Sequence, residues 1–223
     1  MSFNDNTLSV VVGGTSGIGA AVARALSLRP GRVEIASRAS GLDIADSAAV
    51  SDYFRKLGPL DHLVVTAGSS APGGTVVDVD LDAARAAFDV KFWGSVALAR
   101  AASGYLRPGG TITFTSGFLA RRAVPGTFVK TAMNAALEAT AKILARELAP
   151  LRVNVVSPGL TQTEAYHGMT AEARDAMFDR AAATLPAGRT GRSDDIARGY
   201  LFAIDNPFVT GSVIDIEGGA LIS

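Results

Sequence analysis

The sequence predicts an α/β protein with a doubly wound parallel β-sheet and helices on both faces. Short apolar runs rich in β-branched residues alternate with Ala-rich amphipathic segments, which is the pattern of parallel strands joined by helices. The length of 223 residues is normal for one α/β domain, and a hydrophobic content of 48% is enough for a sizeable core. We therefore predict a single domain over residues 1–223, without a repeat or a linker.

The apolar runs define the expected strands, and the amphipathic segments between them define the helices. The strands are predicted at Leu8–Val12, Val33–Ala36, His62–Thr66, Thr111–Thr115, Val153–Val156 and Val213–Ile216. Helices are expected to begin near Ile18, Ser47, Leu81, Gly126 and Ser193, and Arg174–Ala183 adds another over the carboxyl edge of the sheet. About a dozen residues separate the second strand from the helix near Ser47, so we expect that a crossover helix has been trimmed and that Ala39–Asp46 is a bare loop.

The composition excludes several classes of function. The 21 basic residues balance 21 acidic ones, which gives no reason to expect nucleic acid or an acidic membrane surface as a partner. The chain has no Cys, and its two His, His62 and His167, are too far apart for a zinc motif, so no metal site is predicted. No apolar run reaches the ~18–20 residues of a membrane span, and the polar segment Met1–Thr7 lacks a signal core, so a cytoplasmic protein is expected.

A Gly-rich turn, Gly13–Gly19, connects the first strand to the first helix. Gly13 permits a tight turn, Gly17 lets the backbone approach a pyrophosphate, and Gly19 lets the helix pack close to the strand. The helix N-terminus then offers free N–H groups and a positive dipole to a phosphate. The alternative is a turn without a ligand, but its place after the first strand of an alternating chain favours a dinucleotide site in a Rossmann fold.

The residues after the second strand indicate which dinucleotide binds. An acidic residue there would bind the ribose hydroxyls of NAD, but Ser37 and Arg38 stand in its place. A hydroxyl and a guanidinium suit a 2′-phosphate, so NADP(H) is preferred over NAD(H). In the alternative, Arg38 stacks on adenine or is only solvated. Asp43 and Ile44 are placed to cap the adenine side.

These features and three further segments resemble the short-chain dehydrogenase/reductase family over nearly the whole chain. Gly13–Gly19 matches the family's TGxxxGIG with Val12 in place of Thr, and Leu63–Gly68 resembles LVNNAG. Arg152–Gly159 matches RVNxVxPG, the loop that holds the nicotinamide carboxamide in the family, and Thr210–Gly219 resembles its final strand. The predicted cofactor-binding residues are Gly13, Thr15, Ser16, Gly17, Ile18, Gly19, Ser37, Arg38, Asp43, Ile44, Ala67, Gly68, Lys91, Asn134, Pro158, Gly159, Thr161 and Thr163.

The resemblance fails at the residues that carry catalysis. The family uses Asn, Ser and a YxxxK pair: Tyr donates a proton to the carbonyl oxygen, Lys lowers the Tyr pKa and holds the ribose, Ser polarises the carbonyl, and Asn relays protons. A gap-free alignment through residues 135–150 puts Lys130 in the Tyr position and Asn134 in the Lys position. Gly117, beside Ser116, takes the Ser position, and Lys91 takes the Asn position. All four catalytic positions of the usual tetrad therefore differ.

Two of these changes are an exchange: Lys91 stands where the family has Asn, and Asn134 stands where it has Lys. The exchange indicates a rebuilt site. The alternative is a coincidence in a pseudo-enzyme. Lys130 lies one helical turn before Asn134 on the same face. Lys91 and Lys130 are expected to depress each other's pKa, so that Lys130 acts as a general acid or stabilises an oxyanion. Ser116 either reaches the carbonyl or is structural.

Two functions remain open on these residues. The first is an NADP(H)-dependent oxidoreductase that acts on an activated carbonyl, such as a dicarbonyl, a quinone or a keto acid, because two ammonium groups suit an electron-rich or anionic partner. The second is a non-catalytic NADP(H) sensor. One or two of the aromatic residues Phe92, Trp93, Phe118 and Phe128 are expected to contact the substrate. Residues 160–190, including Glu164, Tyr166, His167 and Met169, resemble the family's mobile substrate lid.

The Ala-rich helices at 81–106 and 127–149 are apolar on more than one face, so a neighbour is expected to cover them. In the family such helices pair across a symmetry axis, which predicts a homodimer or a homotetramer. The basic pair Arg121-Arg122 is too short to form a nucleic-acid-binding patch.

Overall fold

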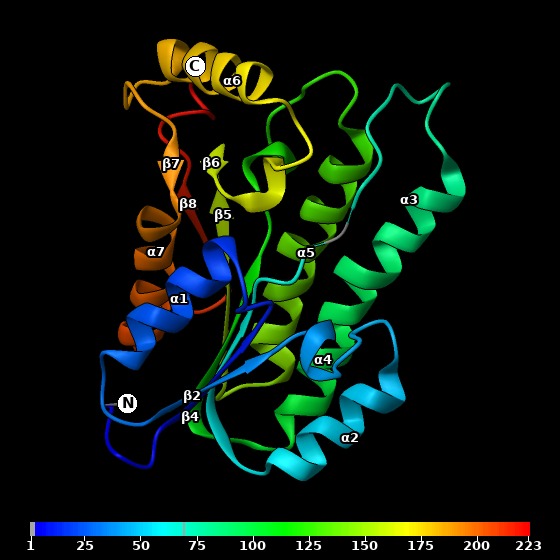
Figure 1. Cartoon of the computed structure of the whole chain (residues 1–223). Coiled ribbons are helices and arrows are strands. Elements are labelled where there is room, and N and C mark those ends of the chain that lie inside the picture. The colour runs from blue at the N-terminus through cyan, green and yellow to red at the C-terminus, as the bar shows by residue number, and fades with distance from the viewer. Residues whose placement is uncertain (1–2, 69) are drawn as a thin grey trace.

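A computed structural model describes residues 3–68 and 70–223. Residues 1–2 and 69 lie outside the described part, and residues 1–2 belong to the N-terminal segment that is predicted to lack a signal core. It confirms the predicted fold class, a doubly wound parallel sheet of the Rossmann type. One sheet has six parallel strands in the order β2-β1-β3-β4-β5-β8 (Figure 1). Its strands are β1 (Leu8–Val12), β2 (Arg32–Ala36), β3 (Leu60–Val65), β4 (Leu106–Thr115), β5 (Arg152–Pro158) and β8 (Val213–Ile216).

Helices cover both faces of this sheet. One face packs against α1 (Gly17–Ser27) and α7 (Ser193–Asp205), and Tyr200 of α7 is fully buried there. The other face packs against α2 (Ser47–Leu57), α4 (Gly94–Ser103) and α5 (Phe128–Glu147). Figure 1 shows these two groups on opposite sides of the strands. No helix in the described part of the chain is long and apolar enough to cross a membrane.

The predicted helix from Leu81 is interrupted. It consists of α3 (Leu81–Phe88), a π-helical turn over Asp89–Trp93 and then α4. The Gly94 N–H donates to the Asp89 carbonyl, five residues back. A π-turn inserts an extra residue into the helical ladder, which changes where the following side chains point, and such turns are frequent at functional sites. Lys91 lies in this turn. The continuous Ala-rich sequence pattern did not predict this π-turn.

The connection between β2 and β3 differs from the expectation. The predicted bare loop over Ala39–Asp46 is wrong at its start, because Arg38–Ser40 forms a 3₁₀ turn. Ser37 and Ser40 cap this turn reciprocally, with the Ser37 N–H donating to Ser40 Oγ at 2.8 Å. Asp46 then caps α2 by accepting hydrogen bonds from two backbone N–H groups. The helix of the crossover is α2 itself.

The carboxyl ends of the strands carry a second small sheet and a further helix. Strands β6 (Thr161–Gln162) and β7 (Gly191–Arg192) pair in parallel, and α6 (Ala171–Thr184) lies between them in the chain. The predicted helix over Arg174–Ala183 is therefore present and slightly longer. Figure 1 shows α6 crossing above the sheet, beyond β6.

Arg152 of the RVNxVxPG segment has a structural role. Its buried guanidinium donates to four backbone carbonyls, those of Ala203 and Ile204 at 2.7 Å and those of Asn206 and Val209 at 2.9 Å. These carbonyls belong to the end of α7 and the loop after it, where helical carbonyls lack intrahelical partners. A cation at the C-terminus of a helix also interacts favourably with its dipole. This part of the motif therefore anchors α7.

Candidate functional site

The Gly-rich turn lies where β1 meets α1, next to the end of β3. Gly13 has φ +88°, and a Cβ on it would lie 2.6 Å from the Ala67 nitrogen. A Cβ on Gly19 would lie 2.1 Å from the Gly13 carbonyl oxygen and 2.4 Å from Thr66 Oγ1. Only glycine fits at these two positions. The close packing expected at Gly19 and the tight turn expected at Gly13 are both present.

A cavity of about 560 Å³ opens above this turn. It lies at the carboxyl ends of β1, β2 and β3, where the strand order reverses and where ligands bind in open α/β sheets. Thirteen of the predicted cofactor-binding residues line it: Gly13, Thr15, Ser16, Gly17, Ile18, Gly19, Ser37, Arg38, Asp43, Ile44, Ala67, Gly68 and Thr163. The sequence did not single out Ala39, Leu42, Val90 and Ala165, which also line it.

Three predicted cofactor residues shape the loop after β5 and do not line this cavity. A Cβ on Gly159 would lie 2.6 Å from the Glu217 Cα, so the loop packs directly against the last strand's extension. Thr161 is buried, and its hydroxyl donates to the Gly159 carbonyl at 2.9 Å. Pro158 is the last residue of β5. These contacts fix the direction in which the chain leaves β5 toward Thr163.

Arg38 and Ser37 lie at one end of the cavity. The Ser37 hydroxyl accepts a hydrogen bond from the Ser40 N–H at 3.3 Å within the 3₁₀ turn, and its own O–H can still donate to a ligand. Arg38 is exposed, lines the cavity, and has no carboxylate partner among the described residues. Its guanidinium therefore keeps all of its donors for a ligand. Asp43 accepts a hydrogen bond from the Ala45 N–H at 3.0 Å, which holds the loop beside the cavity.

The exchanged amine and amide are in direct contact. Lys91 Nζ donates to Asn134 Oδ1 at 2.7 Å and to the Ser116 carbonyl oxygen at 3.5 Å. The π-turn carries Lys91, the buried face of α5 carries Asn134, and the end of β4 leads to Ser116. Burial, together with a smaller contribution from the positive charge of Lys130, lowers the pKa of Lys91 to about 8. The expected effect of Lys130 on the Lys91 ammonium is therefore present.

Lys130 itself is exposed and lies one turn before Asn134 on α5. Gly117, the residue in the family's Ser position, lies against the same amide. A Cβ on Gly117 would be 3.0 Å from Asn134 Nδ2, which is closer than ordinary van der Waals contact. The Asn134 side chain thus takes space that a larger residue at 117 would need. Glycine at position 117 and asparagine at position 134 are therefore sterically compatible.

The Ser116 hydroxyl is directed to a network that the sequence did not reveal. Ser116 Oγ donates to the buried Glu138 carboxylate at 2.8 Å. Arg121 bonds to Glu138 through its Nε at 3.2 Å and also forms an ion pair with Asp215 of β8. Its partner in the basic pair, Arg122, donates to the Ala220 carbonyl at 2.6 Å. The Arg121-Arg122 pair therefore holds the segment after β4 to α5 and to the C-terminal residues, and it is not a surface patch.

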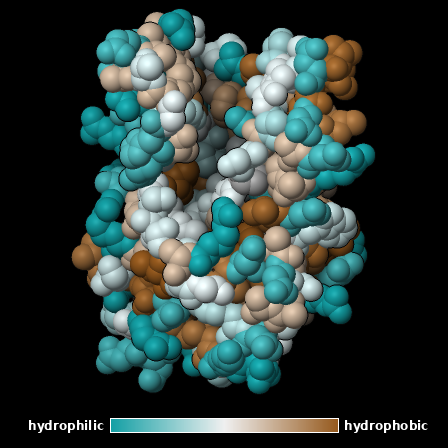
Figure 2. Space-filling view, turned by 45° about the vertical axis from the view of Figure 1, so that its right-hand side comes forward, coloured by the Kyte–Doolittle hydropathy of each residue, from teal (hydrophilic) through white to brown (hydrophobic). Residues whose placement is uncertain are grey.

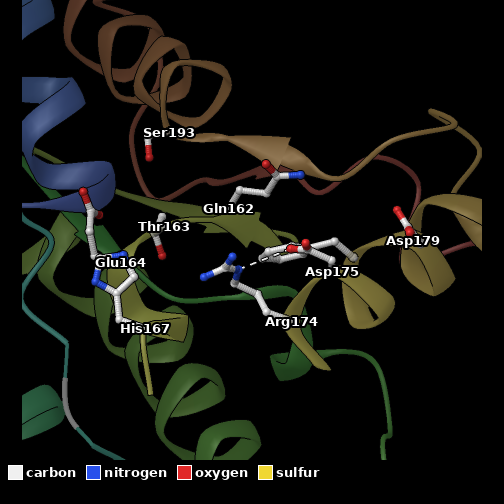
Figure 3. A pocket seen from close by; sticks show the side chains of 9 residues that line it. Gln162, Thr163, Glu164, His167, Arg174, Asp175, Asp179 and Ser193 are labelled. Carbon is white, nitrogen blue, oxygen red and sulfur yellow. Dashed lines mark hydrogen bonds and ion pairs between the residues drawn. The ribbon is translucent and has the colours of Figure 1, made fainter. Parts of the chain in front are cut away.

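A second cavity of about 450 Å³ lies between α6, β6 and the start of α7 (Figure 3). Its lining is polar and carries charges of both signs: Gln162, Thr163, Glu164, His167, Arg174, Asp175, Phe178, Asp179 and Ser193. Thr163 and Glu164 line both cavities and so form the wall between them. Figure 2 shows a deep hollow between the two upper lobes of the molecule.

Comparison with known proteins decides the family. Residues 32–220 match the family model described as enoyl-(acyl carrier protein) reductase. The short-chain dehydrogenase/reductase ATR9 from Stachybotrys chlorohalonatus is 32% identical in an alignment of 248 positions that covers 96% of each chain. The chain belongs to the short-chain dehydrogenase/reductase family. It is thus an oxidoreductase by descent.

Two further members are informative about this short-chain dehydrogenase/reductase. A crystal structure described as a small-chain dehydrogenase in complex with NADPH has 56% sequence identity and a TM-score of 0.96, covering 98% of this chain and 100% of the other. Carbonyl reductase family member 4 from Xenopus tropicalis is 27% identical, covering 94% of this chain and 95% of the relative.

Of the two site contacts that the sequence did not predict, one has a recognisable sequence signal and the other has none. Glu138 lies one turn after Asn134 on α5, so it shares the face that meets the end of β4. Glu164 follows Thr163 directly and accepts a hydrogen bond from the Gly17 N–H. No local pattern predicts that contact, because the two residues are 147 positions apart.

Proposed function

We propose that this protein is an NADP(H)-dependent oxidoreductase that transfers hydride between the nicotinamide and an activated carbonyl. The observation that carries the proposal is the contact between the Lys91 amine and the Asn134 amide beside Lys130. Random loss of a catalytic site leaves no reason for an amine and an amide to exchange places and remain hydrogen-bonded. The names of the relatives, which include a carbonyl reductase, support the same class of reaction.

The residues present fit NADP(H). The N–H groups at the start of α1 suit the pyrophosphate, and the unpaired Arg38 guanidinium suits the 2′-phosphate. Loop residues Asp43 and Ile44 would border the adenine. The similar structure that contains NADPH supports this choice. When bound, NADP(H) supplies or accepts the hydride.

Arg38→Ala should weaken NADPH binding far more than NADH binding. Arg38 pairs with a phosphate that only NADPH carries, and a charge-assisted hydrogen bond contributes roughly 1.5–3 kcal/mol, which is about tenfold to 150-fold in the dissociation constant. Titration of both cofactors into the wild type and the variant measures this. Arg55→Ala removes an exposed guanidinium outside the cavity and is the matched control. Equal losses for NADPH and NADH would mean that Arg38 contacts the adenine or nothing.

The two lysines take different parts in this mechanism. We propose that the Lys91 ammonium, together with Asn134, holds the ribose hydroxyls of the bound cofactor. Val90, next to Lys91, lines the dinucleotide cavity, whereas Lys91 and Asn134 do not. Lys130 serves the carbonyl oxygen, either by donating a proton or by stabilising the negative charge that develops there. Two ammonium groups favour an electron-rich or anionic substrate, so we propose a dicarbonyl, a quinone or a keto acid. Residues 160–190 would act as the substrate lid.

A panel of such carbonyls tests the proposal. The loss of NADPH absorbance is followed with each compound and with matched unactivated ketones. Turnover of at least one activated class, with the unactivated ketones slower, is expected. Tight NADPH binding without turnover of any compound would favour the non-catalytic sensor, the alternative that the change of all four tetrad positions supports.

The protein should form a homodimer or a homotetramer through α3–α4 and α5. Large apolar side chains on these helices are exposed in the single chain, with Trp93 at 59% and Ile143 at 54% of their full accessibility. Burying such faces against a second copy is favourable. Sedimentation velocity at micromolar concentration should give a dimer or a tetramer, and Ile143→Asp should shift the distribution toward smaller species. A wild-type monomer at that concentration would refute this assembly.

A further inference from the structure

The side chain that caps the N-terminus of α1 comes from the lid. Ser16 occupies the cap position, but its side chain makes no capping hydrogen bond, and the first turn of α1 has no acidic residue. The Gly17 N–H instead donates to Glu164 Oε2 at 2.9 Å. Glu164 begins a 3₁₀ turn over Glu164–Tyr166, which Thr163 caps. A carboxylate of the lid thus binds the positive end of α1.

This carboxylate lies where the proposed cofactor needs an anion site. Glu164 lines the dinucleotide cavity together with Gly17 and Ile18. The positive end of a helix binds one negative group well, and a second negative group beside it is repelled. The pyrophosphate of NADP(H) and the Glu164 carboxylate therefore compete for the same end of α1.

The second cavity offers the Glu164 side chain an alternative position. Glu164 forms the wall between the two cavities, and on the far side it faces a space lined by Arg174 and His167. Figure 3 shows the Arg174 guanidinium directed into that space, toward the side on which Glu164 lies. Among residues 3–68 and 70–223, the Arg174 side chain is held only by its neighbour Asp175, at 3.4 Å. Its guanidinium is thus available to a carboxylate that leaves Gly17.

We infer that Glu164 sets the affinity for NADP(H) by competing with the pyrophosphate at the start of α1, and that Arg174 receives the carboxylate when the cofactor binds. The inference rests on the proposed function, because it needs NADP(H) in the cavity. It adds a residue of the lid to the determinants of cofactor affinity. No other described carboxylate caps this end of α1.

Direct binding measurements test the competition without turnover. Glu164→Gln should raise the affinity for NADPH on the order of fivefold, because it removes the charge that opposes the pyrophosphate. Adenosine 2′-monophosphate, which lacks the pyrophosphate, should bind the wild type and the variant equally. Glu172→Gln, in the first turn of α6, removes a carboxylate of the same region outside both cavities and should leave both affinities unchanged.

A double-mutant cycle tests the position that receives the carboxylate. Arg174→Gln should weaken NADPH binding in the wild-type background and have no effect in the Glu164→Gln background. An unchanged or lower NADPH affinity in Glu164→Gln would overturn the competition, and a lower one would mean that the contact with Gly17 latches the lid over the cofactor. An equal effect of Arg174→Gln in both backgrounds would overturn the role of Arg174. If NADPH bound neither the wild type nor Glu164→Gln, the proposed function itself would fail.

Discussion

Lys130→Met should lower turnover of an activated carbonyl by about 10²- to 10⁴-fold, the range expected when a general acid is removed. Lys130 is exposed and one turn from Asn134, so its ammonium can reach a carbonyl without a role in folding. Methionine keeps the length and the apolar stem of the side chain but removes every donor. NADPH affinity should stay within a few-fold, because Lys130 serves the carbonyl oxygen and not the ribose.

Steady-state rates, with NADPH affinity measured separately, distinguish these effects. Lys142→Met is the matched control, since Lys142 is also exposed on α5 and lies three turns beyond Lys130. It should leave both rate and affinity unchanged. If turnover survives in Lys130→Met, the proton comes from water or another group, and the mechanism with Lys130 is wrong.

NADPH affinity should fall roughly tenfold as the pH rises through about 8, where Lys91 loses its proton. An ammonium has three donors, and Lys91 directs two of them to Asn134 Oδ1 and the Ser116 carbonyl. In the mechanism that we propose, the third donor binds the cofactor. A neutral amine keeps only two N–H groups, so deprotonation would remove the donor that we assign to the ribose. Because the pKa is lowered, the favourable form exists below pH 8 and is lost above it.

Two variants assign this pH dependence to Lys91. Lys91→Arg keeps its charge throughout the accessible range, so the decline should disappear. Lys130→Met removes the charge that repels the Lys91 ammonium, which should move the decline to higher pH. Lys91→Ala should harm both NADPH binding and turnover. An unchanged midpoint in Lys91→Arg would show that another group titrates.

The fold was predictable because its signals are local. Each predicted strand is a short apolar run, and the spacing of the glycines in Gly13–Gly19 indicates the backbone conformation of that turn. The exceptions depend on contacts that are distant in sequence. The π-turn at Lys91 lies inside an uninterrupted helical pattern, since no single residue type marks where a helix takes an extra residue.

The site was predictable only in part for the same reason. The proximity of Lys91 and Asn134 was predicted, because both align with positions that lie near one another in the family. The partner of the Ser116 hydroxyl was not predicted, since Glu138 meets it, and Arg121 meets Glu138, only after α5 packs against the end of β4. The contact between Glu164 and Gly17 joins the lid to the first turn of α1, and only the tertiary structure brings these two residues together.

The most direct test of the central claim follows hydride from the cofactor. NADPH carrying deuterium at the reactive nicotinamide carbon is supplied with the best activated carbonyl, and the product is analysed by mass spectrometry. With a dicarbonyl or a keto acid as the substrate, we predict that the wild type transfers the label to the former carbonyl carbon and that Lys130→Met transfers it at a rate lower by orders of magnitude. Tight NADPH binding with no label in any product would contradict it and leave a protein that binds the cofactor without catalysis.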